Sequence, residues 1–477
     1  MWVFLGVLGS FGVAVGGWFA GALPVREPWG VWTGHSTAVT VAGALAAYLG
    51  LTLLLVAWWR YGKGDRPHPL RTLAAWSAPL LLAPPLYSAD VYSYIAQGAM
   101  VLEGHDVYTD GPSVLPPDSR GADAAASVGG HWTDTPAPYG PAFLLLAKGV
   151  VALTGGAVVP SVLAFRLFAV ASLALIVWGV RALARERGAD EGGALWLAAL
   201  NPLLLIHVVG GTHNDGLMAG LVLAGAVWAL RGRWAVAAVL IACAAMVKSP
   251  AALALLFVGV VVWRRGGGAP WSRAVRAFVL PGAVAAAVAA GASVLAGTGL
   301  GWARTQSVAG TIHTALSLSS DLGLGLGQAA RVLLGADPDP VKGAVQSLGL
   351  ALALAVIGWL ALRSLRPWRG RPVLDPVHAL GLALLALVAL SPMVQPWYLL
   401  WGTVVVAATA WSTTTGRVLA VLSAALTYET APDGHTPWYG FVLAGLVCAA
   451  GLLWLRRSGA DRATGVAGVA EKDSLPA

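Results

Sequence analysis

Charged residues are scarce in this sequence. Asp, Glu, Lys and Arg make up 11% of its 477 residues, whereas hydrophobic residues make up 57%. A soluble domain carries about 25% charged residues, so this chain lacks the charge that a water-exposed surface needs. Apolar runs close to the ~20 residues that span a bilayer recur along the whole length. The composition therefore excludes a soluble fold and predicts an all-α, polytopic transmembrane protein.

Cysteine is nearly absent as well. The two cysteines, Cys243 and Cys448, both lie inside apolar runs, where a thiol behaves as a small buried hydrophobe. A disulfide framework is thereby excluded. The sequence also lacks an HExxH pattern, so a tight metal site is not indicated. The N-terminus has neither a basic region nor a cleavage signature, so we expect its first apolar run to be a retained helix.

Basic residues exceed acidic ones and give a net charge of +8. In a soluble protein this excess would suggest a nucleic-acid partner. Here the basic residues gather in short loops between apolar runs, which is typical of cytoplasmic loops that contact anionic lipid. We therefore expect membrane lipids as partners and no nucleic acid. The basic segments assigned to the cytoplasmic side are 60–71, 181–187, 231–233, 264–276, 363–371 and 456–457.

With these loops inside the cell, the apolar runs predict a multi-pass plasma-membrane protein with both termini cytoplasmic. Including short segments, we expect about 12–14 membrane helices. They form a single domain over residues 1–457, followed by a disordered cytoplasmic tail over 458–477. The main crossings are predicted near residues 3–22, 37–59, 72–88, 160–184, 192–208, 214–231, 274–298, 343–363, 374–390, 397–413, 415–430 and 436–455.

Three apolar segments do not fit a simple crossing. Residues 235–263 are interrupted at Lys248-Ser249-Pro250 while both flanks are basic, which predicts two half-length helices that enter and return. Residues 141–156 and 322–335 lie on the outer side, where we expect re-entrant or interfacial helices. The largest outer loop, about 89–140, holds acids, histidines and aromatics.

Few ionisable residues fall in the middle of the predicted helices, which counts against an ion-coupled transporter. Acidic residues collect instead at the outer helix ends. Asp90 directly follows the third crossing, and Tyr92, Tyr94 and Gln97 come soon after it. A carboxylate at the boundary between water and lipid suits a general base. Asp90 could equally cap the helix that begins at Val91.

Other outer-loop residues extend this candidate site, although simpler roles as helix caps, rigid loop residues or an interfacial aromatic belt are open to them. The further substrate-binding candidates are Asp106, Tyr108, Trp132, Tyr139, His213, Asn214, Asp215, Gln395, Trp397 and Tyr398. The cations that could hold a phosphate are Arg166, Lys248 and Arg304. Arginine suits forked phosphate contacts, but each of these cations could also anchor the chain at the interface.

Five blocks taken together resemble the polyprenol-phosphomannose-dependent α-1,6-mannosyltransferases of the bacterial cell envelope, which belong to the GT-C class of membrane glycosyltransferases. The likeness extends from about residue 80 to 410. Its blocks are the nonapeptide from Asp90, Pro138-Tyr-Gly-Pro141, His213-Asn-Asp215, Lys248-Ser-Pro250 and the octapeptide Ser391–Tyr398.

This resemblance implies a GT-C bundle with interfacial outer-loop helices and a site on the outer face. It implies a polyprenyl-phosphomannose donor and a mannan, lipomannan or other glycolipid acceptor. Asp90 matches the catalytic base of the class, which leads us to expect one displacement with inversion. No cofactor is required, and a loosely held divalent ion is left open.

Three alternatives stay open at this point. A polytopic transporter or lipid flippase shares the number of crossings, but it predicts buried charges and pseudo-symmetric halves. A GT-C enzyme that uses another polyprenyl-phosphate sugar, such as an arabinosyl donor, shares the sequence pattern. A non-catalytic scaffold with the same fold is the third alternative.

Overall fold

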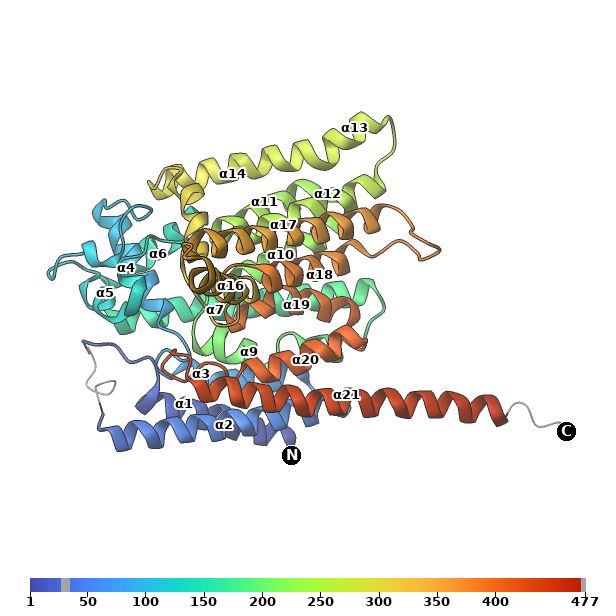
Figure 1. Ribbon diagram of the computed structural model, residues 1–477, viewed down its shortest axis with the longest axis horizontal. Helices are drawn as coiled ribbons and strands as arrows, with labels where there is room; N and C mark the ends of the chain where they lie inside the picture. Colours follow the sequence, from blue (N-terminus) through green and yellow to red (C-terminus); the bar gives the residue numbers. More distant parts are fainter. Residues whose placement is uncertain (27–34, 473–477) are drawn as a thin grey trace.

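Helices make up the architecture of the computed structural model, which describes residues 1–26 and 35–472. Within those residues there is no β-strand, only an isolated bridge between Trp368 and Arg371. The predicted all-α class is therefore confirmed. Most helices lie side by side, and α4, α5 and α6 form a separate group at one end of the bundle (Figure 1).

The first half of the chain contains α1 (Trp2–Ala20), α2 (Thr37–Lys63), α3 (Pro69–Leu81), α4 (Asp90–Glu103), α5 (Ala122–Val128), α6 (Pro141–Thr154), α7 (Val158–Glu186), α8 (Glu191–Leu197), α9 (Pro202–Leu204), α10 (Asp215–Leu230) and α11 (Trp234–Val247). The second half contains α12 (Leu253–Arg265), α13 (Pro270–Ala274), α14 (Leu280–Ala296), α15 (Val308–Thr311), α16 (Leu318–Leu334), α17 (Pro338–Leu365), α18 (Pro376–Leu390), α19 (Leu399–Ala410), α20 (Thr414–Leu426) and α21 (Trp438–Lys472).

Six segments of the described chain are long and apolar enough to cross a membrane, which makes this a multi-pass membrane protein. They are Trp2–Ala20, Thr37–Lys63, Val158–Glu186, Pro270–Ala296, Pro338–Arg363 and Trp438–Arg457. The pair Glu191–Leu197 and Pro202–Gly210, bent by 51°, would make a seventh. The predicted total of about 12–14 membrane helices depends on shorter helices and stays a prediction.

Several apolar helices at the centre of the bundle are short. Helices α10, α11, α18 and α20 have between 13 and 16 residues each. At 1.5 Å per residue, such helices reach only about 20–24 Å, compared with ~30 Å of bilayer hydrocarbon. Polar residues at their ends can therefore lie below the level reached by the longer helices.

The break predicted at Lys248 is present. Helix α11 ends at Val247, a 3-10 turn over Ser249–Ala252 follows, and α12 begins at Leu253. Trp234 at the start of α11 and Arg265 at the end of α12 line one hollow, so the two helices leave and return to the same end of the bundle. This hairpin carries Lys248 at its tip.

The C-terminal helix α21 runs from Trp438 to Lys472 and projects past the other helices (Figure 1). The predicted boundary at residue 457 falls inside this helix, so the backbone is helical through 458–472, where a disordered tail was expected. Residues 473–477 of that expected tail lie outside the described part of the chain. The division into one domain and a tail stays a prediction.

Candidate active site

Four chain segments meet where the predicted site blocks converge. They are the start of α4 at Asp90, the start of α10 at Asp215, the tip of the α11–α12 hairpin at Lys248, and the 3-10 turn Pro396–Tyr398 that leads into α19. Each of these four segments is separated in the sequence by more than a hundred residues from at least one other. Tertiary packing alone brings them together.

The Asp90 carboxylate contacts the side chains of His213 and Tyr94 rather than the backbone N–H groups at the start of its helix. Nδ1 of His213 lies 3.2 Å from Oδ2 of Asp90, and the Tyr94 hydroxyl donates to the same oxygen at 3.5 Å. No side-chain hydrogen bond caps α4, and the Ser88 hydroxyl accepts from the backbone N–H of Asp90 at 3.0 Å. The Asp90 side chain therefore does not cap α4, and its role as a general base stays a prediction.

The Asp90 carboxylate is charged at neutral pH and remains accessible. Its side chain is 26% exposed, whereas that of His213 is fully buried. Burial opposes the charge on Asp90, but the His213 imidazole and the Lys248 ammonium favour it, so the pKa of Asp90 lies below its ordinary value. An ionised carboxylate with one open side can accept a proton from a bound hydroxyl.

His213 is fixed by aromatic packing rather than by directed hydrogen bonds. Its ring stacks on Trp397 with centroids 3.9 Å apart and planes 29° from parallel. His207 lies beside both rings, with its centroid 4.9 Å from that of Trp397 and 5.6 Å from that of His213. Although Nδ1 of His213 is close to Asp90, the two do not have hydrogen-bond geometry, so the contact is a short-range electrostatic one.

A second acidic residue, Asp215, forms a buried ion pair with Lys248. The Lys248 Nζ lies 2.9 Å from both carboxylate oxygens, and the two side chains are 12% and 1% exposed. The indole N–H of Trp401 donates to Oδ1 of Asp215 at 2.6 Å. The ammonium also lies over the Tyr398 ring, 4.5 Å from its centroid. Such dense pairing is what a desolvated ion pair requires.

The Pro138-Tyr-Gly-Pro141 block is packed directly on the end of α11. The Gly140 N–H donates to the Val247 carbonyl at 3.3 Å. A Cβ at Gly140 would come within 2.3 Å of the Met246 carbonyl oxygen, so only glycine permits this approach. Tyr139 is held by Tyr94, with ring centroids 5.3 Å apart. The block therefore ties the Asp90 helix to the Lys248 turn.

Backbone strain is placed just before two of the site blocks. Tyr87 has φ of +60° and precedes Ser88, while Thr212 has φ of +61° and precedes His213. Residues other than glycine rarely adopt this conformation, and a β-branched residue such as threonine does so least readily. Strain of this kind costs about 1–3 kcal/mol per residue and is concentrated at functional sites.

Several buried polar atoms near this cluster have no hydrogen-bond partner among the described residues. They are both side-chain amide atoms of Asn214, the Trp397 indole N–H and the Gln97 carbonyl oxygen. Buried polar groups normally find partners, so each of these atoms retains an unused hydrogen-bonding capacity. Gln395, beside Trp397, is partly exposed.

Other predicted site residues form hydrogen bonds within the loops around the cluster. The Asp106 carboxylate accepts from the Tyr108 N–H at 3.0 Å and from Thr109 at 2.8 Å, which closes its own turn. Tyr108 donates to the Tyr139 carbonyl at 3.1 Å. The Tyr92 hydroxyl donates to the Ala22 carbonyl, so these residues support the loops around the site.

Of the three predicted phosphate ligands, the structure brings Lys248 into the cluster. Arg166 is 3% exposed and donates to the backbone carbonyls of Leu81, Pro84 and Gly210. It therefore holds the chain between α3 and α4. Arg304 is exposed on the 3-10 turn Gly301–Ser307, which is tied to the hairpin tip by a hydrogen bond from Ser249 to Gln306.

Trp132 lies partly exposed in the 3-10 turn Gly130–Thr133, where its ring packs against His131 at 4.9 Å between centroids. Residues that the sequence analysis did not select are Trp401, His207 and Ser88. Trp401 follows Trp397 by four positions, one helical turn, and that spacing was the available signal. In residues 1–26 and 35–472, no three His, Cys, Asp or Glu side chains are placed to hold a metal ion.

The fold and the cluster define a class: a multi-pass helical membrane protein with a buried ion pair and an accessible, ionised carboxylate at converging helix ends. Two family models match the sequence, one described as "Alpha-(1->6)-mannopyranosyltransferase, N-terminal domain" over residues 3–264 and one described as "MptB C-terminal domain" over residues 319–469. The chain belongs to the alpha-(1->6)-mannopyranosyltransferase family, which confirms the resemblance read from its five blocks.

Curated relatives carry corresponding names. A probable alpha-(1->6)-mannopyranosyltransferase of Mycolicibacterium smegmatis is 38% identical over 86% of this chain and 79% of its own length. An alpha-(1->6)-mannopyranosyltransferase of Mycobacterium tuberculosis is 34% identical over 88% and 80% of the two chains. Alpha-(1->6)-mannopyranosyltransferase B of Corynebacterium glutamicum is 32% identical over 85% and 72%.

Proposed function

We propose that this protein transfers mannose from a polyprenyl-phosphomannose donor to a mannan or lipomannan acceptor and forms an α-1,6 linkage. The names of its relatives support mannosyl transfer with this linkage. The observation that carries the proposal is the Asp90 carboxylate, which is ionised, 26% exposed, and flanked by His213 and the Lys248–Asp215 pair.

The reaction is a single in-line displacement. Asp90 takes the proton of the acceptor hydroxyl while that oxygen attacks the anomeric carbon of the donor. The bond between the anomeric carbon and the phosphate oxygen breaks, its electron pair leaves with the lipid phosphate, and a β-linked donor gives an α-linked product. No covalent enzyme intermediate forms, so a second nucleophilic carboxylate is not needed.

Lys248 is the cation proposed to receive the departing phosphate charge. Asp215 occupies two of its hydrogen-bonding directions, and a lysine ammonium has three donors, so one donor remains. Electrostatic stabilisation of a leaving group in a dry site is worth about 3–4 kcal/mol per preorganised donor. Asp215 orients this donor and neutralises Lys248 when no phosphate is bound.

The site is proposed to face the outer side of the plasma membrane, with both termini in the cytoplasm. Support comes from the basic loops, which favour the cytoplasmic side, and from the acidic and aromatic residues gathered at the opposite helix ends. A loosely bound divalent ion stays a separate prediction, and the proposed proton transfer does not depend on it.

The transporter alternative is less well supported. The buried charges of the central cluster are Asp215 and Lys248, which neutralise each other, and they lie at helix ends rather than along a path through the bundle. An enzyme that uses another polyprenyl-phosphate sugar has the same geometry and differs only in the sugar pocket.

The test is a mannosyl-transfer assay in membranes, comparing the wild-type protein with Asp90→Asn at matched expression. Asparagine keeps the shape of the side chain but cannot accept the proton. We expect transfer to fall by about 10²–10⁴-fold, the usual contribution of a general base. Asp118→Asn is the matched control, because Asp118 is an exposed acid in the same outer loop.

Equal transfer by the wild-type protein and Asp90→Asn would exclude Asp90 as the base. If the wild-type protein transfers no mannose, polyprenyl-phosphoarabinose and polyprenyl-phosphoglucose should be supplied in parallel. Transfer from either would overturn the mannose assignment but retain the base, provided that Asp90→Asn abolishes it.

A further inference from the structure

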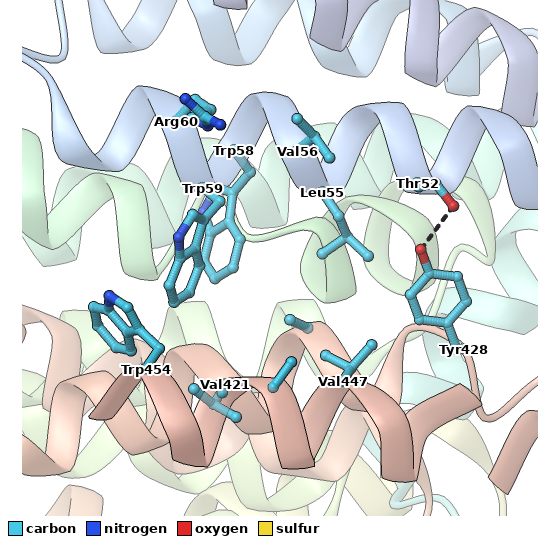
Figure 2. A pocket seen from close by; sticks show the side chains of 13 residues that line it. Thr52, Leu55, Val56, Trp58, Trp59, Arg60, Val421, Tyr428, Val447 and Trp454 are labelled. Carbon is cyan, nitrogen blue, oxygen red and sulfur yellow. Dashed lines mark hydrogen bonds between the residues drawn. The ribbon is translucent and has the colours of Figure 1, made fainter. Parts of the chain in front are cut away.

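An apolar hollow of about 380 Å³ lies between α2 and the C-terminal helices α20 and α21. In Figure 1 these helices form the side of the bundle opposite α11, α12 and α14, so the hollow is remote from the Lys248 hairpin. Small and branched side chains face it, among them Val56 from α2, Val421 from α20, and Val447 and Ala450 from α21 (Figure 2). Val56 and Ala450 are exposed on the surface of the bundle.

At each end of this hollow, a pair of aromatic side chains bridges α2 and the C-terminal part of the chain. At one end, Tyr48 stacks on Tyr428 with centroids 6.4 Å apart, and Thr52 bonds to the Tyr428 hydroxyl at 2.8 Å. At the other end, Trp59 meets Trp454 edge-on at 4.7 Å between centroids. Figure 2 shows the hollow extending along α2 between these two contacts. From Thr52 to Arg60 the helix advances about 12 Å.

Positive charge gathers at the tryptophan end of the hollow. Arg60 lines the hollow with its guanidinium over the Trp2 ring at 5.4 Å, and Lys63 lies over the Trp59 ring at 5.6 Å. Arg456 and Arg457 follow Trp454 within one turn of α21. All four side chains are exposed, and none forms an ion pair within the part of the chain that the structure describes. Basic pockets between membrane helices attract anionic lipid headgroups.

We propose that this hollow binds an anionic phospholipid from the leaflet on the basic side of the protein. One acyl chain lies between α2 and α21, and the phosphate is held by Arg60 with Lys63 beside it. The opposite end is closed by the Thr52–Tyr428 hydrogen bond, and the residues that line the hollow there include no Lys or Arg, which fits a chain terminus and not a headgroup. A polyprenyl phosphate whose phosphate enters the Asp90 site does not match this polarity.

The test measures lipid binding to the purified full-length protein by native mass spectrometry, with phosphatidylglycerol and phosphatidylcholine of identical chains. We expect tighter binding of phosphatidylglycerol. Arg60→Gln should weaken phosphatidylglycerol binding about fivefold, since one basic residue near a headgroup contributes about 1 kcal/mol. Arg264→Gln is the matched control, because Arg264 is an exposed arginine at the end of α12, away from the hollow.

A second pair of variants tests the acyl-chain position. Ala450→Phe fills the hollow and should reduce binding of both lipids at least fivefold. Ala449→Phe places the same ring on a neighbouring exposed position that does not line the hollow, and it should have no effect. Both positions are exposed on α21, so loss of folding would affect the two variants alike.

Equal affinity for the two lipids, or unchanged phosphatidylglycerol binding in Arg60→Gln, would overturn the headgroup assignment. Binding of undecaprenyl phosphate in place of phosphatidylglycerol would overturn the proposal as a whole. Because the readout is lipid binding, its failure leaves the mannosyl-transfer proposal untouched, and the reverse also holds.

Discussion

The Lys248–Asp215 ion pair should hold the site together as well as prepare it for a phosphate. Lys248→Met leaves the Asp215 carboxylate, 1% exposed, with the Trp401 indole as its remaining donor. Removing one member of a buried pair typically costs about 3–5 kcal/mol, because the other charge is left uncompensated. We therefore expect Lys248→Met to lower the free energy of unfolding by about that amount.

The converse substitution should cost less. Asp215→Asn retains an acceptor for the Trp401 N–H, and the ammonium left behind is 12% exposed and lies over the Tyr398 ring. The double variant Lys248→Met/Asp215→Asn buries no net charge, so it should recover much of the stability lost in Lys248→Met. Transfer should stay low in the double variant, because the cation for the leaving phosphate is absent.

Graded SDS unfolding of the detergent-purified protein, followed by tryptophan fluorescence, measures the stability of all four proteins. Mannosyl transfer is measured on the same preparations. A coupling energy of about 2 kcal/mol or more is expected for this contact, because neighbouring charges are not additive. Additivity within about 0.5 kcal/mol would refute the reasoning, as would a double variant that transfers mannose at the wild-type rate.

Three further predictions follow from the same geometry. Gly140→Ala should lower both the stability of the protein and its mannosyl transfer, because the added Cβ would lie 2.3 Å from the Met246 carbonyl oxygen. Gly149→Ala is the control: that position has open space around it, so the variant should fold and act normally in the same assays. Arg166→Lys should lower thermal stability while leaving the KM for the donor unchanged, because Arg166 binds backbone carbonyls; a selective rise in that KM would contradict this role. The folded pKa of Asp90 is lowered, so its contribution to stability is complete above the ordinary pKa of about 3.9 and is lost only as the pH falls below that value toward the lowered folded pKa. Transfer rates measured between pH 7 and 5 should therefore show no titration attributable to Asp90.

The short helices explain how polar chemistry fits into so apolar a chain. Asp215, Lys248 and Tyr398 all lie at the ends of apolar helices of 16 residues or fewer. A full-length crossing would carry such residues to the membrane surface. A shorter one leaves them in a recess, where charge pairing is stronger than in water. Under the proposed mechanism, this recess is where the leaving phosphate would be stabilised.

The sequence by itself determined the class of protein, because low charge and repeated apolar runs admit few structures other than membrane helices. It also selected, from short blocks at helix ends, four residues that the structure brings together in the candidate site: Asp90, His213, Asp215 and Lys248. The break at Lys248 followed from basic residues on both flanks of one apolar stretch. These are local properties, and local spacing is enough to infer them.

Only the tertiary structure decided which residue contacts which. Arg166 and Lys248 are both cations near outer helix ends in the sequence. In the structure, Arg166 donates to three backbone carbonyls, whereas Lys248 forms an ion pair with Asp215. Trp401 lay unnoticed within an apolar run until packing placed its N–H against Asp215. Asp90 likewise contacts His213, more than a hundred residues away, only in the folded chain. Contacts between distant helices are fixed by how whole helix faces pack. The spacing of residues along the chain does not determine this packing.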